Sequence, residues 1–440
     1  MAVNVRGSGK RLLTPEVIAM ESLMRLQDHL IVIRTLRTDY KKYFERHIGN
    51  HVSIKKDFRT IVNDGRVITD SSVSPLVDRH VDIAVDTRKN VVLEFNDEDL
   101  TLDIQNFSQR YLSAGPEDIA NVYDETAARK IMLGIPFSAN PDSPGTGLTT
   151  DAMQDVRSLH TELAIPKNMS NYALLRPSDV ASVSKDVKDV HLPPMVSQVI
   201  REAFQGKLAG FYVFDGVLTP DQVVLGSNQA TPLVKANSGY EGDAIPTDGW
   251  GANNAKVINK GSQIQIAGVN HSRVRGERSD TGIPMTFTVT ADVSTDGSGN
   301  ATIPISPELN AGGLNTQDGS GNNVSLRAFK NASQKAANNA AITVIGSSKA
   351  ANQNHTTSQR YKVGLFYEEN IAQYVNVIIA KPTSSVWHGQ AYDAQTGLSM
   401  TVVRDFDIKD MTETTRLDAL WGIDMVYPEL ATKYLSSKVG

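Results

Sequence analysis

Three adjacent acids, Asp97, Glu98 and Asp99, are the first residues whose type could support chemistry. Carboxylates of this kind hold metal ions or transfer protons when they converge on one point. Neighbouring side chains on one segment do not converge in this way, whereas acidic residues at the start of a helix are stabilised by its positive end. We interpret this run as a helix start or a solvated loop.

Other short motifs lack the spacing that catalysis or ligand binding requires. His47 and His51 are separated by Gly49 and Asn50, which argue against one shared helix face. The sequence DGSGN occurs at residues 296–300 and 318–322 without the ligand spacing of a calcium loop, so both copies predict turns. The basic sequence GSGKR at residues 7–11 does not have the spacing of a phosphate-binding loop. The sequence predicts no catalytic residue, no cofactor and no metal site.

Charged side chains are instead concentrated in a strand-like stretch at residues 51–95. An Asp-Gly pair within residues 61–68 indicates a hairpin turn between apolar runs. A hairpin this polar buries little against itself, and an isolated hairpin is marginally stable in water. We therefore predict an arm, residues 52–92, that lies across a neighbouring subunit and whose removal leaves the subunit folded. The candidate contact residues on it are Lys55, Lys56, Asp57, Arg59 and Arg66.

A second charged cluster occupies residues 272–280 and contains Arg273, Arg275 and Arg278. One interpretation is a solvated loop. The alternative is a contact in which these guanidinium groups pair with carboxylates of a neighbouring subunit. Exposed ion pairs are individually weak, but their contribution accumulates when the contact is repeated many times.

Composition limits the class of protein. The chain has 440 residues, a formal net charge of −5, 21% charged and 40% hydrophobic residues, and no cysteine. These values are typical of a globular protein with two or three packed units and without basic character for tight nucleic-acid binding. The absence of cysteine excludes thiol catalysis and disulfides. Apolar runs such as residues 30–33 are too short to span a bilayer, and no apolar segment of a signal peptide follows the basic start.

The composition changes within the chain, at residues 226–355. This block contains 19 charged residues in 130 positions, against 74 in the other 310, and 16 of the 32 glycines. Such a shift in mid-chain indicates a module inserted into a host domain. Strand patterns at residues 263–269, 285–293, 301–305 and 341–345 predict a small β-barrel or sandwich.

The elements expected outside this block are mixed. Helical spacing predicts helices over residues 15–36, 151–163 with Thr150 as the cap, 195–205 and, in short form, 368–375. Helical spacing also runs through residues 99–131, where Gly115 and Pro116 predict a break or a kink. Strands are expected at residues 81–87, 171–177, 361–367, 376–382 and 415–426. The sequence therefore predicts an α+β fold.

Five phrases, from four parts of the chain, resemble the coat proteins of short-tailed Salmonella phages. KGSQIQIAGV and MTFTVTADVSTDGSGNATIPISPEL are similar to their insertion domain, and DLTLDIQNFSQRYLSAGPEDIANVYDETAARKI is similar to their long spine helix. KLAGFYVFDGVLTP resembles the phrase that precedes the insertion, and RDFDIKDMTETTRLDALWGIDMVYPEL resembles the closing strands. The matches follow the family's order over most of residues 99–430. Residues 112–121 depart from the family's usual pattern at Gly115 and Pro116.

The resemblance implies the tailed-phage major capsid protein fold with an inserted all-β barrel-like domain. Its parts are an N-terminal arm at 1–50, an extended hairpin loop at 51–98 and a peripheral domain with the spine helix at 99–150. The axial domain follows at 151–225 and 356–395 around the insertion at 226–355, and closing peripheral strands occupy 396–440. The chain is accordingly expected to be a coat protein without enzymatic activity.

The resemblance also implies partners. Such proteins form hexamers and pentamers of an icosahedral shell around double-stranded DNA, with a scaffolding protein, a portal protein and in some cases a cement protein, and without a membrane. The alternative is a tail or decoration protein with an inserted β-module. A carbohydrate-active enzyme would need paired acids beside an aromatic platform, and none of Trp250, Trp387 and Trp421 has such acids in sequence.

Overall fold

The computed structural model describes most of the chain. The described residues are 15–36, 51–56, 59–60, 62, 66, 79–96, 114–165, 170–189, 206–215, 221–225, 232–251, 253–273, 278–317, 323–347, 358–380, 387–393, 397–408 and 412–439. Within them, helices and three large sheets together form an α+β fold, as the sequence predicts. No helix in this part of the chain combines the length and the apolar character that a membrane crossing requires.

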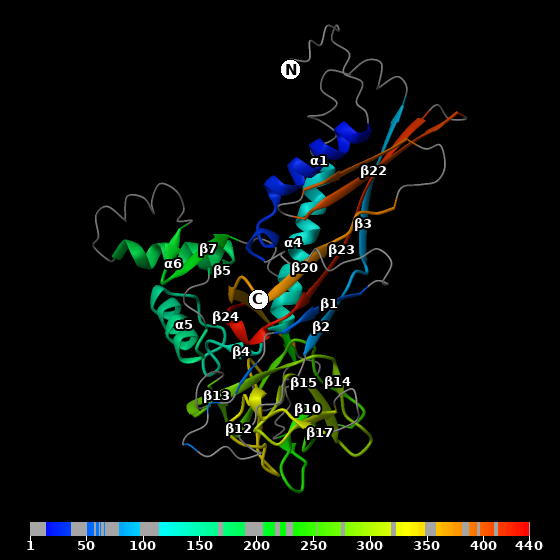
Figure 1. The fold of residues 1–440 in the computed structure, drawn as a ribbon. Helices are drawn as coiled ribbons and strands as arrows, with labels where there is room; N and C mark the ends of the chain where they lie inside the picture. The colour runs from blue at the N-terminus through cyan, green and yellow to red at the C-terminus, as the bar shows by residue number, and fades with distance from the viewer. Residues whose placement is uncertain are drawn as a thin grey trace.

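The first large sheet has five strands and extends away from the rest of the molecule (Figure 1). Its strands are β20 (Ala372–Asn376), β23 (Thr412–Met425), β22 (Ser399–Asp407), β21 (Trp387–Tyr392) and β3 (Thr87–Asn96), the last pairing with β23. Along β23 the side chains of Leu417, Ala419, Trp421 and Ile423 are buried, which confirms the alternation predicted from the sequence. This alternation turns one face of the sheet toward two helices.

Those helices are α1 (Pro15–His29) and α4 (Ala114–Gly134), which pack against each other and against this sheet. Tyr123 of α4 stacks on Trp421 of β23, with ring centroids 3.7 Å apart. Asp124, also on α4, accepts hydrogen bonds from the backbone N–H groups of Ile31, Val32 and Ile33. The carboxylate thereby fixes the chain that leaves α1.

This arrangement corrects one prediction for the helices. The helix expected over residues 15–36 ends at His29, because the following backbone donates to Asp124 and forms the short helix η1 (Ile33–Thr35) instead. Gly115 and Pro116 lie in the first turn of α4, where a proline leaves no hydrogen bond unmade. The pattern at 99–113 lies outside the described residues, so the break or kink expected at Gly115 and Pro116 stays a prediction.

The second large sheet carries the host domain. It comprises β4 (Phe137–Ser138), β24 (Ala431–Val439), β19 (Ser358–Glu368), β5 (Asn171–Leu175), β7 (Phe211–Asp215) and β6 (Lys207–Leu208), with β8 (Gln222–Leu225) pairing with β19. The helices α5 (Thr150–Glu162) and α6 (Pro177–Asp189) lie beside this sheet (Figure 1). Side chains from α5, α6, β5, β7 and β19 share one apolar cluster, so helices and sheet form a second core.

Three further predictions need correction here. The cap of α5 is Thr149, whose side chain accepts from the backbone N–H of Ala152, and Thr150 is already helical. Helix α6 was missed by the sequence analysis, and the helix expected at 195–205 lies outside the described residues. The short helix expected at 368–375 is wrong, because residues 372–376 form strand β20 against β23. The strand expected at 376–382 is wrong as well, because β20 ends at Asn376 and residues 377–380 form no strand. Pairing with a distant strand outweighs the local pattern there.

The third large sheet is the inserted domain and forms a nearly closed barrel. Its strand order is β18 (Ile342–Val344), β12 (Gln263–Ser272), β13 (Asp280–Val289), β15 (Ala301–Leu309), β10 (Gly242–Asp248) and β9 (Leu233–Val234). A bridge between Leu233 and Ala341 joins its two ends. This confirms the predicted barrel-like, all-β insertion.

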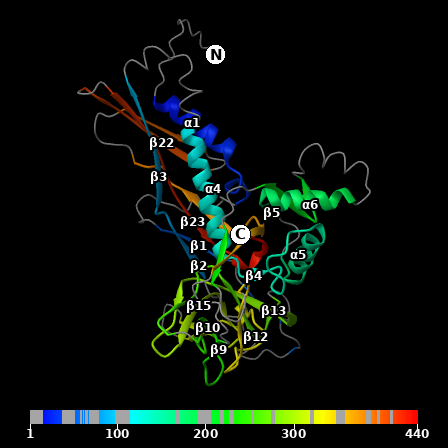
Figure 2. The same ribbon diagram turned by 180° about the vertical axis from the view of Figure 1, so that it is seen from behind.

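The barrel leaves the host sheet between two paired strands. β8 ends at Leu225 and β19 begins at Ser358, and these two residues are partners in the β8–β19 pairing. The chain therefore departs from and returns to neighbouring positions of one sheet. Seen from both sides, the barrel lies at the opposite end of the molecule from α1 and the tip of the first sheet (Figures 1 and 2).

Candidate functional site: the hairpin junction

The base of the charged hairpin is held by its own chain. Strands β1 (His51–Lys55) and β2 (His80–Ala84) pair antiparallel, with Lys55 opposite His80. Alternation buries Val52 and Ile54 of β1, while the exposed face carries Lys55. The buried side chains share an apolar cluster with Ile83, Val85, Val375 and Val426. The hairpin base is thus part of the subunit core.

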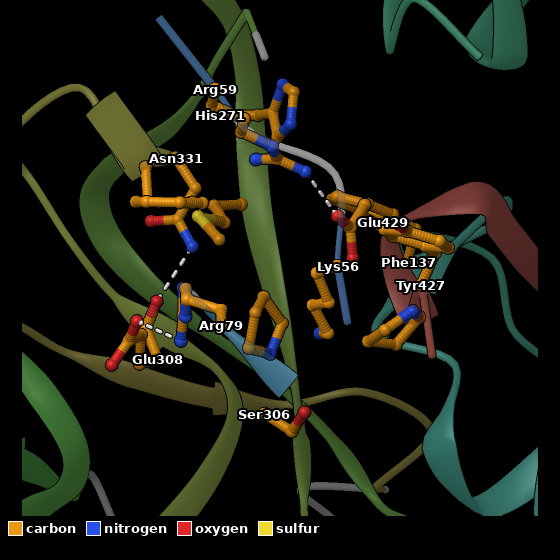
Figure 3. A pocket seen from close by; sticks show the side chains of 14 residues that line it. Lys56, Arg59, Arg79, Phe137, His271, Ser306, Glu308, Asn331, Tyr427 and Glu429 are labelled. Carbon is orange, nitrogen blue, oxygen red and sulfur yellow. Dashed lines mark hydrogen bonds and ion pairs between the residues drawn. The ribbon is translucent and has the colours of Figure 1, made fainter. Parts of the chain in front are cut away.

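Beyond β1 the hairpin meets the inserted barrel and the segment after β23. We call this meeting point the hairpin junction, and it encloses a cavity of about 210 Å³ (Figure 3). Its lining residues are Lys56, Arg59, Arg79, Phe137, His271, Met285, Ser306, Pro307, Glu308, Phe329, Asn331, Tyr427, Pro428 and Glu429. Four parts of the chain therefore contribute to one cavity: the hairpin, β4 through Phe137, the barrel and the segment after β23.

Two ion pairs join these parts. Arg59 contacts Glu429 at 2.5 Å, which connects the hairpin to the segment that follows β23. Arg79 contacts Glu308 at 2.9 Å, which connects the hairpin to β15 of the barrel. The guanidinium of Arg79 also lies over the ring of Phe329, 4.9 Å from its centroid. Both pairs are partly buried, where the Coulomb attraction is less screened than at a fully exposed surface.

Arg278 ties the barrel to the hairpin in a third way. Its side chain is buried and donates to the backbone carbonyls of Arg327 and Thr60, at 2.9 and 3.0 Å. Burial lowers the pKa of this guanidinium, and the charge of Arg59 lowers it further. Arginine nevertheless stays protonated in proteins, so the two carbonyls receive charge-assisted hydrogen bonds.

Burial lowers the pKa values of two titratable groups at the junction, Lys56 and His271. Burial lowers the pKa of Lys56, an effect that Glu429 opposes and that Arg79 and Arg59 reinforce. Burial lowers the pKa of His271 to about 4, so this imidazole is neutral at neutral pH. The ring of His271 packs edge-on against Phe137, with centroids 5.3 Å apart.

The candidate contact residues fall into three groups. Lys56, Arg59 and Arg278 come together at the junction, although the hairpin and the 272–280 cluster are distant in sequence. Lys55, Arg66 and Arg273 are exposed at separate places. Asp57 and Arg275 lie outside the described residues.

The sequence does not predict the residues that pair with the candidate contact residues at the junction. Arg79, Glu308, Phe329, Tyr427 and Glu429 carry no local signal, because Arg79 and Glu308 are 229 positions apart and Arg59 and Glu429 are 370 apart. Periodicity reports which face of an element is buried, and it does not report which distant element meets it. The junction could therefore not be assembled from the sequence.

The other sequence motifs that lie within the described residues have structural roles. Asp296 accepts hydrogen bonds from the backbone N–H groups of Ser298 and Asn300, which confirms the first DGSGN as a turn. Residues 7–11, 97–99, 318–322 and His47 lie outside the described residues, and His51 is the exposed first residue of β1. Among the residues that are described, no three His, Asp or Glu side chains cluster as metal ligands.

Part of the chain is similar to a known protein family. Residues 247–435, which run from the barrel through β23 into β24, match the family described as "P22 coat protein - gene protein 5". No curated protein matches the chain. The matched part comprises 189 of the 440 residues, and over these residues the chain is similar to a structural coat protein of a phage.

Solved structures with a similar course of the chain come from other phages. The capsid of Ralstonia phage GP4 is 7% identical with a TM-score of 0.44, covering 99% of this chain and 95% of that one. A chain from Mycobacterium phage Che8 is 11% identical with a TM-score of 0.42, covering 99% and 98%. A chain from Gordonia phage Cozz is 9% identical with a TM-score of 0.39, covering 99% and 91%.

Proposed function

We propose that this protein is the major capsid protein of an icosahedral tailed-phage head, and that it builds the shell as hexamers and pentamers that associate through the outer end of the molecule. We define the outer end as α1 with the residues directly after it, together with β3, β21 and β22 and the residue after it, Ile408. The shell encloses double-stranded DNA, and the protein itself carries out no catalysis. The observation that carries this proposal is the distribution of exposed apolar side chains.

Apolar exposure is concentrated at the outer end. Among the described residues, eleven large apolar side chains are exposed, and nine of them belong to the outer end: Val17, Met20, Met24, Ile31, Val92, Trp387, Tyr392, Phe406 and Ile408. The other two are Val62 and Tyr212. Contiguous exposed apolar surface on a soluble protein marks an interaction site.

The geometry of α1 supports the same conclusion. One side of this helix buries Ile18, Leu23 and Leu26 against its own subunit, and the opposite side exposes Met20 and Met24. A surface helix in a monomer has one apolar stripe, whereas a helix covered on both sides is apolar around its circumference. A second copy of the chain would supply the missing cover.

The remaining parts of the proposal extend the resemblance noted in the sequence. We infer that a scaffolding protein directs assembly, that a portal protein occupies one vertex and that a cement protein is an optional addition. The domain boundaries at 50, 98, 150, 225, 355 and 395 belong to this proposal, as do inter-subunit roles for Lys55, Arg66, Arg273 and Arg275. In support, Lys55, Arg66 and Arg273 are exposed.

The proposal is tested by removing apolar surface at the tip of β22. Phe406 and Ile408 are 47% and 79% exposed, so the double variant Phe406→Ser, Ile408→Ser should leave the subunit folded. Each side chain contributes about 1.5–3 kcal/mol when fully buried in a contact, and a tenfold loss of association corresponds to about 1.4 kcal/mol. Negative-stain microscopy of the chain, expressed with and without a candidate scaffolding protein, should then show at least about tenfold fewer shells.

The matched control is Tyr212→Ser, which removes an exposed aromatic side chain from β7 in the host sheet. This variant should assemble as the unchanged protein does. Shells formed in normal yield by the Phe406→Ser, Ile408→Ser variant would contradict a role for the outer end. Failure of the unchanged chain to form shells under every condition would contradict the proposal as a whole.

A further inference from the structure

The cavity at the hairpin junction has an unbalanced charge. Three cationic side chains line it, namely Lys56, Arg59 and Arg79, against two carboxylates, Glu308 and Glu429. Each carboxylate is already paired with one arginine. Among the described residues, no carboxylate forms an ion pair with Lys56, so one positive charge is left over.

The position of Lys56 makes this excess unfavourable in an empty cavity. Its ammonium lies 5.8 Å from the centroid of the Tyr427 ring, and its side chain is directed into the cavity between Tyr427 and the Arg79–Glu308 pair (Figure 3). Desolvation is the largest cause of the lowered pKa of this group. A partly desolvated cation that lacks a counter-charge is costly, and an anion at hydrogen-bond distance removes that cost.

Neutral polar groups complete the lining. His271 is 2% exposed, and its Nδ1 atom has no hydrogen-bond partner among the described residues. Ser306 adds a hydroxyl group and Asn331 an amide. A buried polar atom without a partner indicates an unfilled hydrogen-bonding position. The volume of about 210 Å³ holds several water-sized groups, each of which occupies about 30 Å³ in the liquid.

We propose that this cavity binds one small oxyanion of the phosphate class. Lys56 supplies the charge that neutralises it, and the hydroxyl group of Ser306, which lies at the same end of the cavity in Figure 3, supplies a hydrogen bond to one of its oxygens. The guanidinium groups of Arg59 and Arg79 add a positive field without leaving their own carboxylates. The site goes beyond the coat function, because it requires no neighbouring subunit.

The location of the cavity means that a bound anion stabilises the contact between separate parts of the chain. The hairpin contributes Lys56, the barrel contributes His271 and Ser306, and the segment after β23 contributes Tyr427. An anion bound among them adds a further link between these three parts of the chain, beside the ion pairs Arg59–Glu429 and Arg79–Glu308. A ligand that binds only the folded state stabilises that state in proportion to its occupancy.

The test uses the purified full-length chain with inorganic phosphate as the probe. Isothermal titration calorimetry should detect saturable binding of one phosphate per chain, and the melting temperature should rise more in sodium phosphate than in sodium chloride of equal ionic strength. In Lys56→Met, which keeps the apolar stem of the side chain, the affinity should fall by about tenfold or more, because a charge-assisted hydrogen bond is lost.

Lys55→Met is the matched control, since Lys55 is the exposed last residue of β1 and directly precedes Lys56. It should bind phosphate within about twofold of the unchanged chain, because surface charges act weakly. Absence of saturable phosphate binding to the unchanged chain would overturn the proposal, and this measurement decides even if Lys56→Met fails to fold. Equal affinity in a folded Lys56→Met variant would overturn it as well. Neither result depends on shell formation.

Discussion

At the scale of single residues, Lys433 is the most unusual charge of the subunit. Its side chain on β24 is fully buried, and its ammonium donates to the backbone carbonyls of Gly261 and Met132 and to the side-chain oxygen of Gln222. Among the described residues no carboxylate pairs with it. Burial therefore lowers the pKa of Lys433 to about 7. One side chain joins β24, the end of α4, β8 and the barrel.

This shift makes stability depend on pH. In the unfolded chain Lys433 has its ordinary pKa of 10.5. Between pH 7 and 10.5 the unfolded state binds more protons than the folded state, so the free energy of unfolding rises with pH. We expect the unchanged protein to gain up to about 1 kcal/mol per pH unit relative to Lys433→Met over this window.

Urea unfolding at pH 7, 8 and 9 checks this prediction. The difference in free energy of unfolding between the unchanged chain and Lys433→Met should grow with pH, because all other groups are common to both proteins. A difference that stays constant over these three pH values would rule out titration of Lys433 in this range.

At the scale of elements, the close crossing of the hairpin over β23 depends on one glycine. A Cβ atom on Gly422 would collide with the backbone carbonyl of Ala84, at the end of β2. Backbone cannot rotate away as a side chain does, so the hairpin or the strand would have to move. Overpacking of this kind costs typically 1–3 kcal/mol.

We therefore expect Gly422→Ala to lower the free energy of unfolding by about 3 kcal/mol. Gly147→Ala is the matched control, because no atom lies within 4 Å of the Cβ position there. It should change stability by less than about 0.5 kcal/mol. Chemical denaturation of both variants measures the two effects, and equal stability would show that the crossing can widen without cost.

The elements also show how far the sequence determines the fold. Strong alternation predicts β23, whose central residues on one face are buried, and β15, which buries alternate residues at its start. The apolar residues of the barrel pattern also predict β12, where Ile264 and Ile266 are buried. Strand β20 was not predictable, because its residues become a strand by pairing with β23. The same holds for Arg79 and Glu308, whose contact exists only after the barrel and the hairpin have packed. Local patterns identify faces, and tertiary pairing supplies the rest.

At the scale of the whole molecule, the base of the hairpin is anchored in the subunit core. The arm predicted over residues 52–92 cannot be removed from a folded subunit, because Val52, Ile54, Ile83 and Val85 belong to the core. That expectation from the sequence is wrong for this physical reason. Between the paired strands, the described side chains of Val62 and Arg66 are exposed.

A narrower change tests the arm. Replacing residues 61–78 with a short glycine–serine linker keeps β1, β2 and the hydrogen bond from the Lys56 backbone to the Arg79 carbonyl. We expect the subunit to unfold within a few degrees of the unchanged protein, since loop length has a small effect on stability. Shells should no longer form, as judged by sedimentation and microscopy. Normal shells from this variant would show that the arm makes no essential contact.

The pairing of Leu225 with Ser358 has a consequence for how the host sheet closes. Bringing these two residues together in an unfolded chain closes a loop of more than 130 residues, whose entropy cost rises with the logarithm of its length. A folded barrel already holds its first and last strands side by side, through Leu233 and Ala341. The effective loop then shrinks to about 25 residues, which lowers the closure cost by about 1.5 kcal/mol. The folded insertion thus lowers the entropy cost of pairing β8 with β19 in the host sheet.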